Sequence, residues 1–331
     1  MIPDTLLRLA INRLSVLRPN EKLVLEEIVD SEALFRSLTP ALLSQIVGRS
    51  IPAMNLCADD LLAHAERDAR FLRSRACRVV SVRDRSYPSR LREIFDPPYL
   101  LYVRGSVPTS DSPAVAIVGT RRPTATAVLA ARSFGADLAR AGVPVVSGLA
   151  RGIDVAAHQG ALQYGVTGAI LASGVDLITP SGHKGVAAAI LDSGGYLASE
   201  YAPGVPPAKY HFPARNRIIS GLARGVVVVQ APARSGALIT ADYALDQGRD
   251  LFVHRDGLEP PVGAGTAELA ADGALIVSGA ADVLNEWGLE TVGETGGDDR
   301  ARTTAVPRCT VEAAAARVDE IRRTLSGGRE A

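Results

Sequence analysis

The strongest constraint on the fold is the alternation of short apolar runs with longer segments of helical periodicity after residue 113. Four runs are apolar throughout, at residues 115–118, 143–146, 169–172 and 226–229. Helical segments are expected near residues 125–141, 153–164, 184–193 and 236–247, with later strands at 251–253 and 274–277. Strands that are apolar on both faces are typical of parallel sheets covered by helices on both sides. The pattern therefore predicts an α/β fold with a doubly wound, mostly parallel sheet.

Two glycine-containing loops follow the first two apolar runs, where the carboxyl ends of parallel strands bind ligands. The first contains Gly119, Thr120 and Arg121, and the second contains Ser147, Gly148, Arg151 and Gly152. Glycine lets backbone N–H groups approach an anion, and a following helix N-terminus adds partial positive charge. Each loop alone could be an ordinary strand–helix turn, but two on neighbouring strands predict a phosphate site. Asp154 is expected to be the N-cap of the next helix.

Three more basic residues are candidates for the same site. Lys184 follows the third apolar run and is expected at the same edge of the sheet, as a ligand residue or as an ordinary solvated lysine. Arg215 and Arg217 lie at the head of a further helix, with Phe212 or Tyr210 available for base stacking. The alternative for each arginine is a structural role, in which it anchors carbonyl groups or acids such as Glu200.

The distribution of charge favours a polyanionic ligand, and the absence of several catalytic motifs disfavours the enzyme classes that carry them. The net charge of the 331 residues is zero, yet residues 112–225 contain ten Lys or Arg against five Asp or Glu, which favours a nucleic-acid partner. The sequence contains no GxGxxG, P-loop, HExxH or G-x-S-x-G pattern and no CxxC pair. We therefore expect no catalytic residue, no metal site and no bound cofactor. The separated cysteines, the short apolar runs and the absence of a signal-like N-terminus favour a cytoplasmic protein without membrane association.

The chain divides into four segments by pattern. Residues 1–76 look like a small all-α domain, and residues 77–113 look like a connector with strands near 78–82 and 99–103. Residues 114–288 form the predicted α/β domain. Residues 289–331 are predicted to form a flexible acidic linker followed by a short helix at 310–325.

Residues 114 to about 285 resemble the DNA-processing protein A family (DprA, also called Smf). The resemblance rests on long motifs in a fixed order: Ala116-Ile117-Val118-Gly119-Thr120-Arg121, Ser147-Gly148-Leu149-Ala150-Arg151-Gly152-Ile153-Asp154, His211-Phe212-Pro213-Ala214-Arg215-Asn216-Arg217 and Ser235-Gly236-Ala237-Leu238-Ile239-Thr240. The helical start resembles the sterile-alpha-motif-like (SAM-like) domain of that family.

The resemblance implies an extended Rossmann-like domain that binds single-stranded DNA. It further implies protection of incoming DNA, loading of the RecA recombinase during natural transformation, and a homodimer joined through the Rossmann-like domains. It implies no enzymatic activity. The family's phosphate contacts correspond here to Gly119, Thr120, Arg121, Ser147, Gly148, Arg151, Gly152 and Lys184. The sequence departs from the family pattern at Thr179 and His183, both in the loop that leads to Lys184.

Two other functions stay open from the sequence. Related phosphoribohydrolases carry a motif of the form PGGxGTxxE, and residues 262–268 keep its Gly and Thr as Gly265 and Thr266. The leading Pro-Gly pair is absent, and Glu268 lies one position too early. The alternative function is thus a nucleotide-binding enzyme of this phosphoribohydrolase-like superfamily, and a third is a nucleotide sensor without turnover.

Overall fold

The computed structural model describes residues 5–52, 56–107 and 113–289. The predicted acidic linker and C-terminal helix, from residue 290 onward, lie outside these residues. Among the helices that are described, none has both the length and the apolar character needed to cross a membrane.

The N-terminal segment is helical, as predicted. Its helices are α1 (Thr5–Asn12), α2 (Pro19–Ile28), α3 (Glu32–Arg36), α4 (Pro40–Val47) and α5 (Ala58–Ser74). Ser31 caps α3 by accepting from the Leu34 N–H, and Thr39 caps α4 by accepting from the Leu42 N–H. Each such cap stabilises a helix start by about 1 kcal/mol. Leucine side chains and Phe35 fill the interior of this segment.

A mixed sheet lies at the centre of the described chain, with the strand order β1-β2-β6-β5-β4-β3-β7-β8-β9. Its parallel strands are β3 (Val115–Val118), β4 (Val145–Ser147), β5 (Thr167–Ile170), β6 (Tyr196–Ser199), β7 (Gly225–Val228), β8 (Asp250–His254) and β9 (Leu275–Val277). This arrangement confirms the predicted doubly wound, mostly parallel sheet. Strand β6 was not among the predicted strands.

The two strands of the connector segment extend this sheet. β2 (Leu100–Gly105) pairs antiparallel with β6, and β1 (Cys77–Ser81) pairs antiparallel with β2. Leu101 and Val103 face the core of the sheet, whereas Leu100 and Tyr102 pack into the N-terminal helical cluster. The Tyr102 hydroxyl accepts a hydrogen bond from the Asn12 side chain at 3.1 Å. The boundaries at residues 76 and 113 stay a prediction, although both strands belong to the central sheet.

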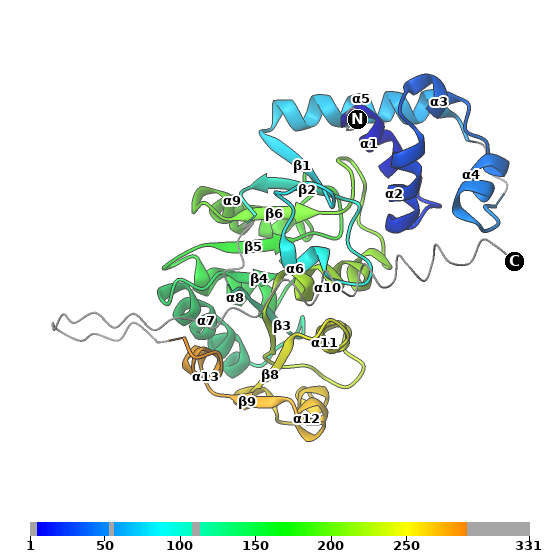
Figure 1. The fold of residues 1–331 in the computed structure, drawn as a ribbon. Helices are drawn as coiled ribbons and strands as arrows, with labels where there is room; N and C mark the ends of the chain where they lie inside the picture. Colours follow the sequence, from blue (N-terminus) through cyan, green and yellow to red (C-terminus); the bar gives the residue numbers. More distant parts are fainter. Residues whose placement is uncertain (1–4, 53–55, 108–112, 290–331) are drawn as a thin grey trace, which may run out of the picture. The chain divides into compact units, whose positions relative to one another are not determined.

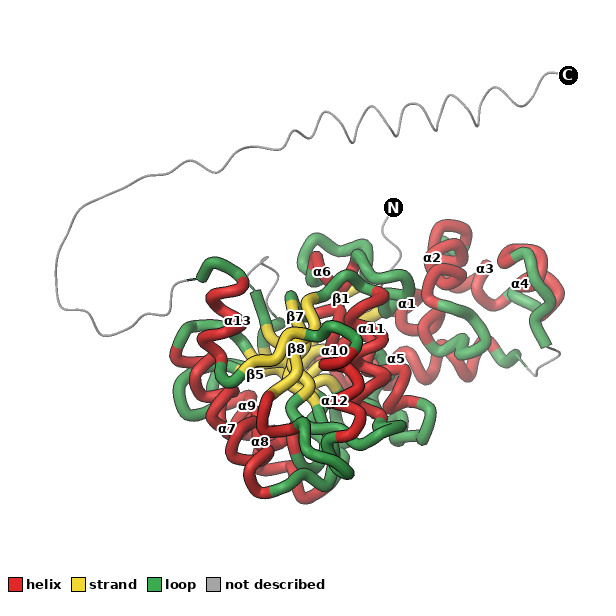
Figure 2. The backbone as a smooth tube through the Cα atoms, turned by 90° about the horizontal axis from the view of Figure 1, so that it is seen from below, coloured by secondary structure: helices red, strands yellow, loops and turns green. Residues whose placement is uncertain are grey.

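Helices cover both faces of the parallel strands (Figures 1 and 2). One layer contains α7 (Ala125–Arg140), α8 (Ile153–Ala161) and α13 (Ala280–Glu286), and the other contains α6 (Ser89–Arg92), α10 (His211–Leu222) and α11 (Gly236–Asp246). Val115 and Ile117 of β3 face the first layer, and Ala116 and Val118 face the second. Helices α9 (Lys184–Asp192) and α12 (Ala264–Ala271), with two 3₁₀ helices at Ser181–His183 and Arg255–Gly257, complete the described elements. Burial on both faces explains the continuous apolar runs in the sequence.

Glycine allows α7 and α8 to approach closely. A Cβ atom on Gly160 would overlap the carbonyl oxygen of Arg132, and one on Gly135 would overlap that of Ala157. The two helices therefore pack backbone against backbone, which fixes where α8 begins. This position matters because the second glycine-containing loop leads directly into α8.

Candidate functional site

The first loop follows β3 and is held against the end of β7. The Thr120 N–H donates to the Gln230 carbonyl oxygen at 2.7 Å, and the Arg122 N–H donates to Thr120 Oγ1 at 3.2 Å. A Cβ on Gly119 would lie 2.9 Å from the Gln230 carbonyl oxygen, so a larger residue does not fit without displacement. Thr120 is buried, whereas Arg121 and Arg122 are exposed. The loop thus presents two arginines at the carboxyl edge of the sheet.

The second loop closes on a buried carboxylate. Asp154 is not the N-cap of α8, which is Gly152; its Oδ2 instead accepts from the Gly148 N–H at 3.1 Å and the Ala150 N–H at 3.3 Å. The Ser147 hydroxyl donates to a carbonyl of β3 at 2.6 Å. The polar groups of Ser147 and Gly148 that were expected to meet phosphate are therefore already engaged within the protein.

The two loops pack against each other. Gly152 has a φ of +81°, a left-handed conformation that favours glycine, and a Cβ there would overlap the Thr120 carbonyl oxygen. Arg151, next to this contact, is exposed. The structure therefore brings Arg151 into the neighbourhood of the first loop, as the sequence predicts.

His183 attaches the Lys184 loop to the second loop. Its Nδ1–H donates to the carbonyl oxygen of Leu149 at 2.8 Å. Lys184 begins α9 and is exposed. His183, a residue that departs from the family pattern, thus holds the Lys184 loop beside the second loop, and the role of Lys184 as a phosphate contact stays a prediction.

Arg215 lies beneath the loops and not on their surface. It is only 4% exposed, and its Nη1 donates to the carbonyl oxygens of Gly148, at 2.9 Å, and Ile170. Burial lowers the pKa of Arg215 to about 10, and the Asp154 carboxylate opposes this shift. Burial also raises the pKa of Asp154, against the effect of Arg215. Arg215 therefore stays cationic at neutral pH and ties α10 to the ends of β4 and β5.

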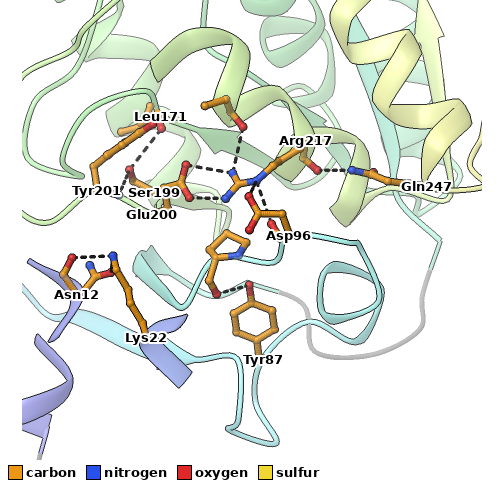
Figure 3. A network of polar contacts seen from close by, with 12 residues as sticks. Asn12, Lys22, Tyr87, Asp96, Leu171, Ser199, Glu200, Tyr201, Arg217 and Gln247 are labelled. Carbon is orange, nitrogen blue, oxygen red and sulfur yellow. Dashed lines mark hydrogen bonds and ion pairs between the residues drawn. The ribbon is translucent and has the colours of Figure 1, made fainter. Parts of the chain in front are cut away.

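Arg217 has a structural role (Figure 3). Its Nη1 and Nη2 donate to the two carboxylate oxygens of Glu200 at 3.1 and 2.6 Å, and its Nε donates to the Asp96 carbonyl oxygen at 3.0 Å. All three guanidinium nitrogens thus bind protein groups, and the side chain is 8% exposed. The alternative prediction, an arginine that anchors Glu200, is confirmed for this residue, and a phosphate contact would require breaking that arrangement.

A pocket of about 860 Å³ opens between the first loop and the N-termini of α10 and α11. Its polar lining includes Thr120, Arg121, Arg122, Asp154, Lys209, Arg215, Asn216, Ser235 and Thr240. The Arg121 guanidinium lies over the Phe212 ring, 5.1 Å from its centroid, a geometry that favours a cation–π contact. Helix N-termini and arginines around one pocket are suited to bind a phosphate group.

The exposed cations at this edge include Arg121, Arg122, Arg151, Lys184 and Lys209, with Arg234 after β7 and Arg255 after β8. Within the described part of the chain, none of them forms an ion pair with an acid. Their charge is therefore available to an external anion. Sequence reasoning did not assign Arg122, Lys209 or Asn216 to the site. Arg122 directly follows Arg121, so a doubled arginine after a strand was the available signal.

No group of three His, Cys, Asp or Glu side chains among the described residues has a geometry that could hold a metal ion.

A family model described as DNA recombination-mediator protein A matches residues 78–288. The chain belongs to this family. It is 43% identical over 206 residues to the protein Smf of Escherichia coli, which covers 61% of this chain and 55% of that protein. It is 41% identical over 208 residues to the DNA processing protein DprA of Streptococcus pneumoniae, with 62% and 73% of the two chains covered.

Two solved structures from the family share the fold. DNA processing protein A from Streptococcus pneumoniae superimposes with a TM-score of 0.69 and 32% identity, over 86% of this chain and 99% of that one. DNA processing protein A from Helicobacter pylori, solved to explain its single-stranded DNA binding mode, gives a TM-score of 0.57 and 30% identity, over 64% and 95%. These similarities confirm the family and the Rossmann-like α/β fold.

Proposed function

We propose that this protein binds single-stranded DNA along the carboxyl edge of its sheet. The observation that carries the proposal is the convergence of three loops, which bring Arg121, Arg122, Arg151 and Lys184 to one edge without acidic partners in the described residues. Arginine forks bind phosphate in two-point geometry, and several cations at one edge fit the repeated phosphates of a strand. The Helicobacter pylori relative, which binds single-stranded DNA, supports this choice of ligand.

The pocket beside these cations favours a single strand over a duplex. Phe212 lines it from α10, and Tyr210 is 72% exposed at the start of the same helix. Aromatic side chains stack on bases that are not paired, and each stacked base contributes about 1–3 kcal/mol. Fluorescence anisotropy of a labelled poly-dT oligomer, competed with unlabelled single strands and with unlabelled duplex, tests the proposal. We expect displacement by the single strand at lower concentration than by duplex of the same length; equal displacement would contradict it.

We further propose the finer role that family membership supports: a non-enzymatic, cytoplasmic homodimer that protects incoming single-stranded DNA and loads RecA on it during natural transformation. The test is the rate of RecA filament formation on DNA coated with single-strand-binding protein. We expect this protein to accelerate filament growth, and an unchanged rate would remove the RecA role while leaving DNA binding intact.

The second candidate is a nucleotide enzyme, and the structure supplies an observation that disfavours it. Thr266, the hydroxyl residue of the motif-like segment, is fully buried in α12, and its Oγ1 accepts from the Ala231 N–H at 2.7 Å. That hydroxyl is therefore used to hold the end of β7. Chromatography of nucleoside monophosphates incubated with the protein tests turnover, and release of a free base would favour the enzyme.

A further inference from the structure

We propose that Gln230 is a positioning residue for DNA binding, because its contacts hold the turn that carries Arg121 and Arg122. We call residues 119–124, the part of the first loop between β3 and α7, the arginine turn. Gln230 follows β7 and is only 1% exposed, so it acts through the turn and not by touching DNA. The inference rests on the proposed function, since it concerns how these two arginines are presented to the phosphates of a single strand.

Gln230 binds both ends of the arginine turn. At the start of the turn, its backbone carbonyl oxygen accepts from the Thr120 N–H at 2.7 Å. At the end, its side-chain Oε1 accepts from the Thr124 N–H at 2.9 Å, and its Nε2 donates to Thr124 Oγ1 at 3.3 Å. Arg121 and Arg122 lie between these two points. One residue therefore fixes both where the turn leaves β3 and where it enters α7.

The contact at Thr124 also joins the turn to the start of α7. Thr124 is the N-cap of this helix, and its Oγ1 accepts from the Ala127 N–H at 3.2 Å. The same oxygen therefore binds both the helix and Gln230. On its other side the turn packs against the second loop, because a Cβ on Gly152 would lie 2.8 Å from Pro123 Cδ. The backbone of the turn is thus restrained from both sides.

The backbone on each side of Gln230 is itself held. The Val229 N–H donates to the carbonyl oxygen of Val118 on β3 at 3.0 Å. On the other side, Thr266 of α12 binds Ala231 twice: its Oγ1 accepts from the Ala231 N–H at 2.7 Å, and its own N–H donates to the Ala231 carbonyl oxygen at 3.1 Å. Gln230 therefore holds the turn from a fixed base, and the Thr266 hydroxyl of the motif-like segment supports that base.

The burial of Gln230 makes this arrangement favourable over others. A buried amide is costly unless it is hydrogen-bonded, and if the turn moved away both side-chain atoms would lose Thr124 as their partner. The turn is therefore ordered before any ligand arrives. Prior ordering reduces the entropy that Arg121 and Arg122 lose when they bind phosphates. A residue that only stabilised the core would not change the DNA affinity of the folded protein, and this difference can be measured.

The test is a double-mutant cycle in which anisotropy of a labelled poly-dT oligomer measures binding. Gln230→Met keeps the length of the side chain but removes its hydrogen bonds, and Arg121→Ala/Arg122→Ala removes the two arginines. We expect Gln230→Met to weaken binding about tenfold, from the cost of ordering two arginine side chains on binding. The slope of log K against log salt should stay the same, because no cation is removed. Without the two arginines, Gln230→Met should change the affinity by less than about twofold.

Gln247→Met is the matched control. Gln247 is half-buried, its Nε2 donates to the Arg217 carbonyl oxygen at 3.0 Å, and it lies at the C-terminal end of α11. This variant should lose stability but bind DNA like the wild type. Circular dichroism confirms that each variant is folded under the binding conditions. If Gln230→Met does not fold, Thr124→Ala replaces it in the cycle, with a smaller loss of affinity expected.

The outcomes separate this inference from the proposed function. Wild-type affinity in folded Gln230→Met, or an equal loss with and without the two arginines, would overturn the positioning role. If Arg121→Ala/Arg122→Ala binds like the wild type, the proposed function fails as well. Weak binding by that arginine variant with normal binding by Gln230→Met would remove only the inference about Gln230.

Discussion

Arg217 joins three parts of the chain that are distant in sequence. Its guanidinium binds Glu200 after β6 and Asp96 before β2, while its own backbone belongs to α10. The pair with Glu200 is largely withdrawn from water. Removing one partner of such a pair leaves the other as an unpaired buried charge, which is the main energetic consequence of a substitution here.

We predict that Arg217→Ala lowers the free energy of unfolding by about 3–5 kcal/mol, because the Glu200 carboxylate then lacks its buried partner. Denaturant unfolding followed by circular dichroism measures the change. The matched control is Arg151→Ala, an exposed position where a change of less than about 0.5 kcal/mol is expected. Equal stability of the two variants would contradict the structural role of Arg217.

His158 is predicted to make stability depend on pH. It is fully buried, its Nδ1–H donates to Thr167 Oγ1 at 2.8 Å, and its Nε2 has no partner in the described structure. Burial, with the charges of Arg215 and His183, lowers its pKa to about 3. Below about pH 6.5 the unfolded chain gains a proton at this residue that the folded chain does not. As the pH is lowered below about 6.5, His158 should therefore reduce the free energy of unfolding by about 1.4 kcal/mol for each pH unit.

The measurement for His158 is the difference between wild type and His158→Gln in unfolding free energy from about pH 7 to pH 4, where the histidine contribution applies. Groups common to both proteins cancel in that difference. We expect the wild type to lose stability more steeply than the variant as pH falls. Parallel curves would show that His158 is not held neutral in the folded protein.

The sequence predicted several basic residues at the carboxyl edge but not which of them face solvent. Arg121 and Arg217 both looked like phosphate contacts, yet only Arg121 is exposed. The difference comes from Asp96, which lies 121 positions from Arg217 and is brought close only by the fold. Asp154 was misplaced as an N-cap for a local reason, since its carboxylate accepts from N–H groups of the loop before α8.

At the level of elements, the site depends on how tightly α8 packs. Gly160 of α8 lies against the backbone of α7 at Arg132. The second loop enters α8 through Gly152, so a shift of α8 moves Arg151 as well. Close packing of these two helices is therefore a condition for the geometry of the loop.

We predict that Gly160→Ala destabilises the protein by about 1–3 kcal/mol, because the added methyl group overlaps the Arg132 carbonyl oxygen. Gly185→Ala in α9 is the matched control, since nothing lies within 4 Å of the added atom. Relief of the helical cost of glycine should make the control neutral or more stable by about 0.5–1 kcal/mol. Thermal unfolding distinguishes the two; a stable Gly160→Ala would contradict the close contact.

Continuous apolar runs predicted β3, β4, β5 and β7 well, because strands buried on both faces have no polar alternation. β6 was missed, since its sequence Tyr-Leu-Ala-Ser is short and mixed, although all four residues are buried. The pairing of β2 with β6 was also not predictable, because its register depends on residues about 95 positions apart, such as Tyr102 and Ser199.

For the whole molecule, the parallel sheet places the proposed binding groups Arg121, Arg122, Arg151 and Lys184 at its carboxyl edge. The net charge of zero hides this distribution, since acids elsewhere balance the arginines. DNA binding should therefore follow local charge and not the overall charge of the protein. Binding of phosphates releases counterions, so the affinity for DNA should fall as salt rises.

The decisive measurement is anisotropy of a labelled poly-dT oligomer against wild type, Arg121→Ala and the control Arg132→Ala across a salt series. We expect salt-dependent binding by wild type and control, and weaker binding by Arg121→Ala with a slope shallower by about 0.7. Identical affinities and slopes for wild type and Arg121→Ala, or binding that ignores salt, would contradict a DNA site at the carboxyl edge of the sheet.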